Sequence, residues 1–349
     1  MLNRIKVFVL ILLSLTLASS CGGGRSNSKV KDEVHAKVAS EVKAKAAEHS
    51  KVQAKSLPAD VNTGKMRNFS IPQVPSLFSG QKETAEYLSV HFWDNFFSTE
   101  KYHTDSLTYN GIAREELQGA MINYVSILYI IPLSEAQKSL AALTDKALAY
   151  PQPEASKGFL KMLEYYLYDA NSVYRNEDFF LPVTSRLATW QELTEVEREK
   201  YARYAKFCAF NQIGTVAADF TYCDKQGRKG TLHTLSAENL LIFFSNPGCS
   251  ACKQIIEKIS ASEKISSLIS GRKLKILNLY IDEDLAAWHE YMPIYPKTWI
   301  NAYQDDFSVR NDTKYNIRAL PSLYILDSEK RVVMRDVPED VAINYLENL

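Results

Sequence analysis

One buried strand that runs into a pair of cysteines constrains the fold of this chain most. Residues 240–244 form an uninterrupted apolar run, which is typical of a strand covered on both faces. A turn at 246–248 ends the strand, and Cys249 and Cys252 follow with two residues between them. Apolar residues then recur near helical spacing from Ile255 to Ile269. The sequence therefore predicts a strand, a turn and a helix that begins at or just after Cys249.

Two cysteines at this position are suited to thiol chemistry. The free N–H groups and the positive end of the helix dipole favour the thiolate of Cys249, and Lys253 adds a nearby positive charge. The spacing lets Cys252 reach the first sulfur across one turn and resolve a mixed disulfide there. We therefore predict that Cys249 and Cys252 are catalytic residues of dithiol–disulfide exchange.

The same cysteine spacing also occurs in zinc sites, which need a second pair of ligands. Cys208 and Cys223 are 15 residues apart and no suitably spaced pair of histidines follows, so neither usual zinc pattern is met. We predict no metal site and no cofactor. Cys208 and Cys223 are expected to be buried structural thiols, although in an oxidising compartment they could bond to each other.

A second motif gives the cysteine pair a family context. The segment Arg318-Ala-Leu-Pro-Ser-Leu-Tyr-Ile-Leu-Asp327 places a proline before an apolar strand, and Gly214-Thr-Val-Ala-Ala-Asp-Phe220 precedes the cysteines. Together these motifs resemble the thioredoxin fold, and more narrowly its membrane-tethered branch, over about residues 210–349. The resemblance implies an α/β domain with a mixed central sheet. It also implies that Pro321 is cis and faces the cysteines.

The resemblance further implies where a substrate binds. In this family the backbone beside the proline forms a short peptide-binding edge, so Pro321 and Leu320 are expected to contact the substrate. Gly248 and Ser250 flank Cys249 and are expected to contact the substrate as well. Gly248 replaces a Trp of thioredoxin, and Phe243 stands where thioredoxin has a buried acid.

A longer loop than a minimal thioredoxin needs lies between these motifs. It contains Trp288, Pro293, Pro296 and Trp299, and it resembles the corresponding segment of the family's C-terminal domains. Long loops in compact domains are often functional, so this loop could border the substrate groove. Equally, it could do no more than cap the sheet.

The N-terminus has the pattern of an export signal. Arg4 and Lys6 precede an apolar run over residues 7–17, which is too short to span a bilayer comfortably. The sequence Ala18-Ser-Ser-Cys21 resembles a bacterial lipobox. We predict a lipoprotein signal peptide over residues 1–20 and lipidation of Cys21. A plain secretory signal with an unmodified Cys21 is the alternative.

Residues 21–68 are expected to be a flexible tether, because they combine glycines and mixed charge with few aromatic side chains. No acidic cluster follows Cys21, so we see no resemblance to a surface-export tag. The predicted location is therefore the cell envelope, with the protein anchored by lipid to the outer membrane and facing the periplasm.

Residues 69–206 are expected to form an all-helical domain, and residues 207–349 the thioredoxin-like domain, giving an α+β protein. Apolar side chains stripe one helix around residues 85–96, and Ser134 and Thr194 each begin a capping-box pattern. The segment His91-Phe-Trp-Asp-Asn-Phe96 resembles a helical domain of unknown function that precedes thioredoxin-like domains in Bacteroidota lipoproteins. That resemblance implies no activity.

Composition supports a two-domain globular protein and argues against nucleic-acid binding. The 349 residues are 46% hydrophobic and carry a formal net charge of zero, without a basic stripe. The leading hypothesis is a membrane-anchored extracytoplasmic thiol–disulfide oxidoreductase. Its expected partners are a protein or peptide disulfide or dithiol, an upstream redox partner and the membrane.

Two alternatives remain at this point. A thiol peroxidase would need a Thr three residues before the attacking cysteine, and that residue is Asn246. The other alternative is a non-enzymatic lipoprotein that binds a partner and holds a structural disulfide.

Overall fold

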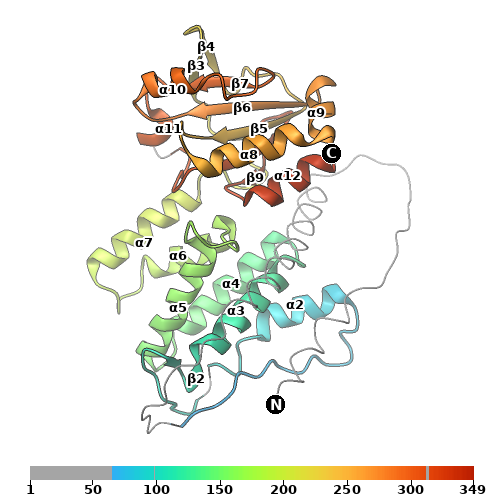
Figure 1. The fold of residues 1–349 in the computed structure, drawn as a ribbon. Coiled ribbons are helices and arrows are strands. Elements are labelled where there is room, and N and C mark those ends of the chain that lie inside the picture. Colours follow the sequence, from blue (N-terminus) through green and yellow to red (C-terminus); the bar gives the residue numbers. More distant parts are fainter. Residues whose placement is uncertain (1–64, 98, 312–313) are drawn as a thin grey trace.

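The structure is a computed structural model, and it describes residues 65–97, 99–311 and 314–349. A helical part lies below a part built on a β-sheet in the view of Figure 1. The predicted signal peptide, Cys21 and all but the last four residues of the predicted tether lie outside the described residues.

Six helices build the helical part within the described range, which confirms the predicted helical architecture. A two-stranded antiparallel hairpin, β1 (Thr108–Tyr109) and β2 (Ile112–Ala113), interrupts it, and strands of two residues are too short to give a periodic pattern. The helices are α2 (Gln81–His91), α3 (Arg114–Leu128), α4 (Leu133–Leu148), α5 (Pro153–Tyr168), α6 (Glu177–Leu187) and α7 (Glu195–Cys208).

Aromatic side chains fill the core of this part. Phe92, Trp93 and Phe96 are almost fully buried, and the Trp93 ring lies edge-on to Phe159 with 4.8 Å between ring centroids. Edge-to-face rings at this spacing add stability beyond the area they bury. The segment around His91 therefore supplies packing.

One of the two predicted capping boxes is confirmed and the other is wrong. The Thr194 hydroxyl accepts a hydrogen bond from the Glu197 amide while the Glu197 carboxylate accepts from the Thr194 amide, so α7 begins as predicted. Ser134 lies inside α4, because that helix begins one residue earlier with Pro132 as its N-cap. The helix therefore begins without a capping hydrogen bond from a side chain, and Ser134 is its second residue.

A seven-stranded mixed sheet forms the C-terminal part, with strand order β4-β3-β7-β6-β5-β8-β9. Strands β5, β6 and β7 are parallel, and the outer pairs are antiparallel, which confirms the predicted mixed sheet. The strands are β3 (Thr221–Asp224), β4 (Lys229–Thr231), β5 (Asn239–Phe244), β6 (Leu274–Tyr280), β7 (Ile300–Tyr303), β8 (Ser322–Asp327) and β9 (Val332–Arg335).

The central strand β5 is buried on both faces, as its apolar run predicted. Leu241 and Phe243 pack into a core cluster with α8 (Ser250–Ala261), while Leu240, Ile242 and Phe244 pack into a second cluster on the other face. Helices α9 (Glu263–Ser270) and α12 (Glu339–Glu347) contribute to the first cluster. Two shorter helices, α10 (Leu285–Tyr291) and α11 (Ser308–Asn311), follow β6 and β7.

The apolar periodicity from Ile255 to Ile269 covers two helices. Ser262 ends α8, and its hydroxyl accepts a hydrogen bond from the Ile265 amide at the start of α9. A serine side chain competes well for backbone N–H groups at a helix start, so the chain changes direction there. Ile255, Ile259 and Ile265 still share one core.

Candidate active site

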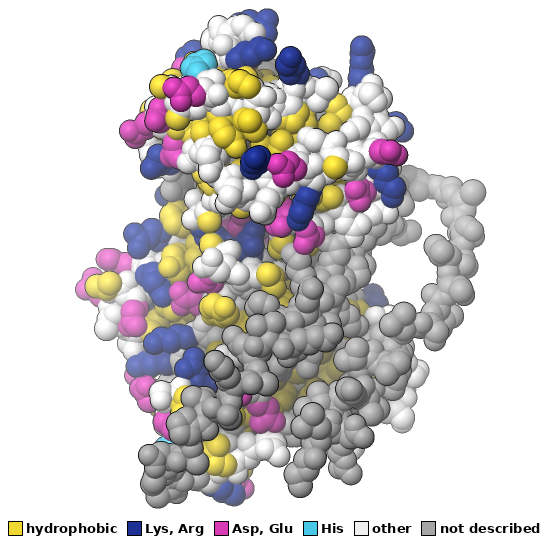
Figure 2. Space-filling model, viewed as in Figure 1, with side chains coloured by type: hydrophobic (Ala, Val, Ile, Leu, Met, Phe, Trp, Pro, Cys, Tyr) yellow, Lys and Arg dark blue, Asp and Glu magenta, His cyan; other side chains and the backbone are white. Residues whose placement is uncertain are grey.

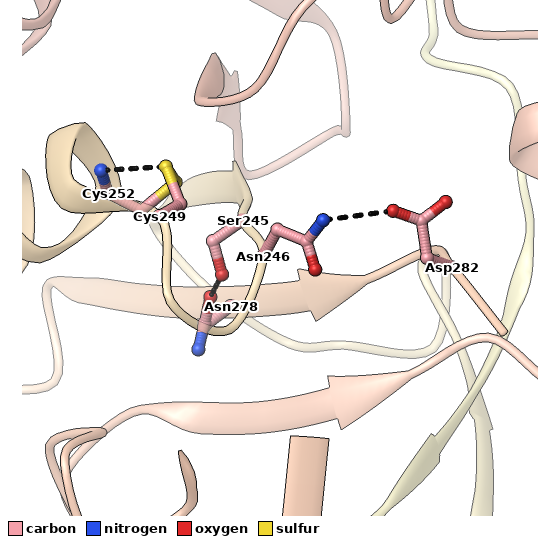
Figure 3. The surroundings of a disulfide bond; sticks show 6 residues. All are labelled: Ser245, Asn246, Cys249, Cys252, Asn278 and Asp282. Carbon is pink, nitrogen blue, oxygen red and sulfur yellow. Dashed lines mark hydrogen bonds between the residues drawn. A yellow bond between two sulfur atoms is a disulfide. The ribbon is translucent and has the colours of Figure 1, made fainter. Parts of the chain in front are cut away.

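A disulfide joins Cys249 and Cys252 at the start of α8 (Figure 3). Their Cα atoms are 5.2 Å apart, within the usual range for a disulfide. Cys249 is the N-cap of the helix, so the expected strand, turn and helix are confirmed. The two sulfur atoms therefore meet at the positive end of a twelve-residue helix.

The two cysteines differ in their access to solvent. Cys249 is partly exposed and both Gly248 and Ser250 are exposed, whereas Cys252 is only 2% exposed. The Cys249 sulfur accepts a hydrogen bond from the Cys252 amide at 3.1 Å. A negative charge on Cys249 would be stabilised by the same amide. The geometry thus favours attack at Cys249 and resolution by Cys252.

The positive charge expected from Lys253 has its own partner. Its ammonium lies 3.8 Å from the Glu257 carboxylate one turn along the exposed surface of α8. An exposed pair of this kind is weak, but the acid offsets the lysine's charge. The helix N-terminus is therefore the main electrostatic feature beside Cys249.

The turn that presents Cys249 depends on a glycine. Gly248 has φ of +73°, and the Cys249 amide donates to the Asn246 carbonyl at 3.2 Å. A proline followed by a residue with positive φ is typical of a type II turn. A Cβ at Gly248 would meet nothing within 4 Å, so the requirement is for backbone conformation and not for space.

Asn246 anchors this turn to the neighbouring strand. Its side-chain amide donates to the Asp282 carboxylate at 3.1 Å, as Figure 3 shows, and Asp282 also pairs with Arg310. Asp282 lies two residues after the end of β6. The anchor was not predicted, because the sequence separates Asn246 and Asp282 by 36 residues.

The Leu320–Pro321 peptide bond is cis, as the resemblance implied. Ser322 pairs with Phe244 in the antiparallel register of β8 and β5, so Pro321 lies at the sheet end where β5 leads into the cysteine turn. Leu320 and Pro321 are both partly exposed. The expected juxtaposition of proline and cysteines at one sheet end follows from this register, while the substrate-binding roles of Leu320, Pro321, Gly248 and Ser250 stay predictions.

Polar side chains of three neighbouring strands are hydrogen-bonded to one another beneath the turn: Ser245 directly follows β5, Asn278 lies in β6 and Asn301 lies in β7. Ser245 donates to Asn278, and the Asn278 amide donates to the Asn301 side chain at 3.0 Å. Phe243, at the position of thioredoxin's acid, is fully buried and lies edge-on to Trp299 at 6.2 Å. Amides and a hydroxyl therefore lie near a position that the resemblance associates with an acid.

The segment predicted as a long loop includes helix α10, which contains Trp288, and its two tryptophans contribute mainly packing. Trp288 is fully buried and Trp299 is 6% exposed, so both cap the sheet. Ile294, between them, is 46% exposed and is the part of the loop that a partner could contact. Of the two interpretations left open by the sequence, capping holds for the tryptophans themselves.

Cys208 and Cys223 are free and buried, as predicted for structural thiols. Burial raises the pKa of both thiols, which favours their protonated form. Within the described ranges, no cluster of three or more His, Cys, Asp or Glu side chains could hold a metal ion. The helices of the described ranges also include none with the length and apolarity to cross a membrane.

Comparisons with known proteins bear on both parts of the chain. Residues 35–209 match a family described as a domain of unknown function (DUF5106), and residues 238–332 match a family described as thioredoxin-like. A comparison with curated proteins found no match.

Several of the solved structures that match this chain come from Bacteroides. A thioredoxin-like protein from Bacteroides caccae is 33% identical, with a TM-score of 0.71 and coverage of 82% of this chain and 99% of that chain. The C-terminal domain of an uncharacterized protein from Bacteroides fragilis is 40% identical over 39% of this chain and 97% of that chain (TM-score 0.38). The thioredoxin domain of a thiol-disulfide oxidoreductase from Bacteroides vulgatus is 21% identical over 39% of this chain and 96% of that chain (TM-score 0.34).

Proposed function

Since this chain belongs to the thioredoxin-like family and carries a domain of the DUF5106 family over residues 35–209, we propose that it is a thiol–disulfide oxidoreductase that acts through Cys249 and Cys252. One observation carries the proposal. A partly exposed sulfur caps a helix, and the sulfur bonded to it is buried one turn deeper. A structural disulfide has no need of this asymmetry.

The proposed reaction transfers two electrons. In the reduced protein the Cys249 thiolate attacks a substrate disulfide, so a mixed disulfide forms and one substrate thiolate leaves. Cys252 then loses its proton and attacks the Cys249 sulfur. This step forms the disulfide seen in the structure and releases the second substrate thiolate. The substrate is reduced and the protein oxidised, and a separate dithiol must reduce Cys249–Cys252 again.

Trapping of the intermediate tests the proposal. Reduced Cys252→Ser protein, incubated with insulin as a macromolecular disulfide, is expected to accumulate a covalent adduct that dithiothreitol releases. Of the pair, the matched Cys249→Ser variant keeps only the buried Cys252, and the free Cys208 and Cys223 are buried as well, so it is expected to form little adduct. Equal adduct formation by both variants, or none by either, would contradict the assigned roles.

The two alternatives predict different measurements. A static disulfide predicts a reduction potential below about −300 mV in a glutathione titration, because structural disulfides resist that buffer. A thiol peroxidase predicts stoichiometric consumption of peroxide by the reduced protein. We expect neither result, since the disulfide is accessible at Cys249 and Asn246 is engaged with Asp282.

A protein partner and an envelope location belong to the same proposal. Apolar side chains gather on the face of the sheet part where α8 and α10 lie, which supports a peptide or protein substrate (Figure 2). Cys21 is proposed as the lipid-bearing residue that anchors the chain to the outer membrane on the periplasmic side. Mass spectrometry of the mature N-terminus would detect the acyl chains or their absence.

A further inference from the structure

Buried charges join the helical part to the sheet part. Glu177, in the first turn of α6, is 4% exposed, and its carboxylate lies 3.2 Å from the guanidinium of Arg335 in β9. The neighbouring Asp178 carboxylate lies 3.0 Å from the same guanidinium. Charges in such surroundings require partners, because an unpaired buried ion costs several kcal/mol. The contact between the two parts therefore has a fixed geometry.

The same carboxylate holds the segment that leads into the cis proline. Asn316 donates its side-chain amide to Glu177, and it also lies 3.2 Å from the Tyr168 hydroxyl. The Arg318 guanidinium is 3.5 Å from Glu177 and lies over the Tyr168 ring, 4.5 Å from its centroid. Two residues of the helical part thus fix the chain three and five residues before Pro321.

The chain on the other side of the proline is fixed through Asp336. Ser322 donates to the Asp336 carboxylate at 3.0 Å, and Arg318 donates to the same carboxylate at 2.6 Å. Arg175, from the loop before α6, approaches Asp336 to 3.3 Å. All three pairs are largely buried. The residues before and after Leu320–Pro321 are therefore linked to each other and to the helical part.

The residues between these fixed points are the accessible ones. Ala319 is exposed, and Leu320 and Pro321 are partly exposed. The proposed function needs this edge, because a substrate that adds strand-like hydrogen bonds binds best to a backbone already held in one conformation. We propose that Glu177 is a positioning residue for this edge, so that the helical part sets the affinity for a protein disulfide.

The inference rests on the proposed function and concerns one part of the site. The cysteines are held by different contacts, namely the Cys252 amide and the anchor of Asn246 on Asp282. Removing the charge of Glu177 should therefore weaken the binding of a large substrate and leave the reactivity of the Cys249 sulfur unchanged. A small disulfide makes no use of the edge and reports that reactivity separately.

Glu177→Gln in the full chain tests the inference. Two single-turnover rates are measured with the reduced protein and an excess of disulfide, one with insulin and one with 5,5′-dithiobis(2-nitrobenzoic acid). For insulin, kcat is the rate at saturation and KM is the concentration that gives half of that rate. The glutamine can still contact Asn316, but it lacks the charge that pairs with Arg318. We expect KM for insulin to rise by about fivefold or more, because couplings between sites typically change an affinity by at least that factor. We expect little change in kcat. The rate with the small disulfide should stay within about twofold of the wild-type rate, which is a small change in activation free energy.

Asp178→Asn is the matched control, because it removes a neighbouring buried charge that pairs with Arg335 and not with the proline segment. It should leave KM for insulin unchanged. If Glu177→Gln does not fold, Asn316→Ala removes the same contact from the other side and should raise KM likewise.

Three outcomes would overturn the inference. These are an unchanged KM, an equal rise in Asp178→Asn, or a parallel loss with the small disulfide. Wild-type protein inactive toward both disulfides would instead refute the proposed function itself.

Discussion

Arg335→Ala should destabilise the protein severely, and the size of the loss in unfolding free energy follows from the contacts of the side chain. The Arg335 side chain is 2% exposed and pairs with both Glu177 and Asp178. It also donates to the carbonyl of Cys208, the last residue of α7, at 3.0 Å and to that of Phe210, two residues beyond the helix. Truncation leaves two carboxylates and two carbonyls buried without this donor. Removing one partner of a buried ion pair costs about 3–5 kcal/mol, so we expect a loss of that size at pH 7.

The pH dependence separates this electrostatic loss from a loss of packing. Burial raises the pKa of Glu177, while Arg335 and Arg318 act to lower it. A raised pKa means that Glu177 favours folding below its unfolded value and that this contribution is lost as pH rises through the folded value. Without Arg335 the folded pKa is higher still. The penalty of the variant should therefore shrink as pH falls from 7 toward 5.

Urea unfolding at several pH values, followed by circular dichroism, measures this penalty. Arg331→Ala is the control, since Arg331 lies just before the same strand and pairs at 2.8 Å with the exposed Glu329, while its own side chain is partly exposed. An exposed pair contributes at most about 1 kcal/mol. A penalty below about 1 kcal/mol for Arg335→Ala, or one that does not change with pH, would refute the reasoning, because a buried unpaired charge predicts neither.

Two further predictions concern the packing around the site. Trp299→Ala should lower the free energy of unfolding by about 3–5 kcal/mol, because it removes a buried ring that packs on Phe243. The rate of exchange with a small disulfide should stay near that of wild type. Slowed exchange at unchanged stability would instead place Trp299 in the substrate groove. Cys208 and Cys223 should resist iodoacetamide at pH 8 in native protein and react after unfolding, because burial raises the pKa of both thiols. Peptide mapping measures both, and fast labelling of either native thiol would contradict its burial.

The sheet and the redox motif could be predicted because their signals are local. The apolar run of β5, the turn with Gly248 and the helical spacing after Cys252 lie within about thirty consecutive residues, the length of a supersecondary unit. Each signal there points to the same answer. The cis bond at Pro321 came from the resemblance and not from the residues alone, since most X–Pro bonds are trans.

Contacts between distant segments could not be predicted. Glu177 and Arg318 are separated by about 140 residues, and in the sequence each looks like an ordinary surface charge. Their burial depends on how the helical part lies against β9, which no periodic pattern records. The anchor of Asn246 on Asp282 was missed for the same reason. Ionic partners in a folded core follow from topology, which local patterns do not contain.

The shared core argues that the two parts act as one unit. One cluster of buried side chains contains Phe159 and Tyr201 of the helical part together with Phe243 and Cys252 beside the site. Separating the parts would expose apolar surface and would also strip Arg335 and Arg318 of partners, both unfavourable. A free thioredoxin-like part would keep its cysteines but lose Glu177, which holds the segment before Pro321. For the proposed exchange reaction we therefore expect substrate affinity to depend on both parts of the chain, and the reactivity of the Cys249 sulfur to depend on the start of α8.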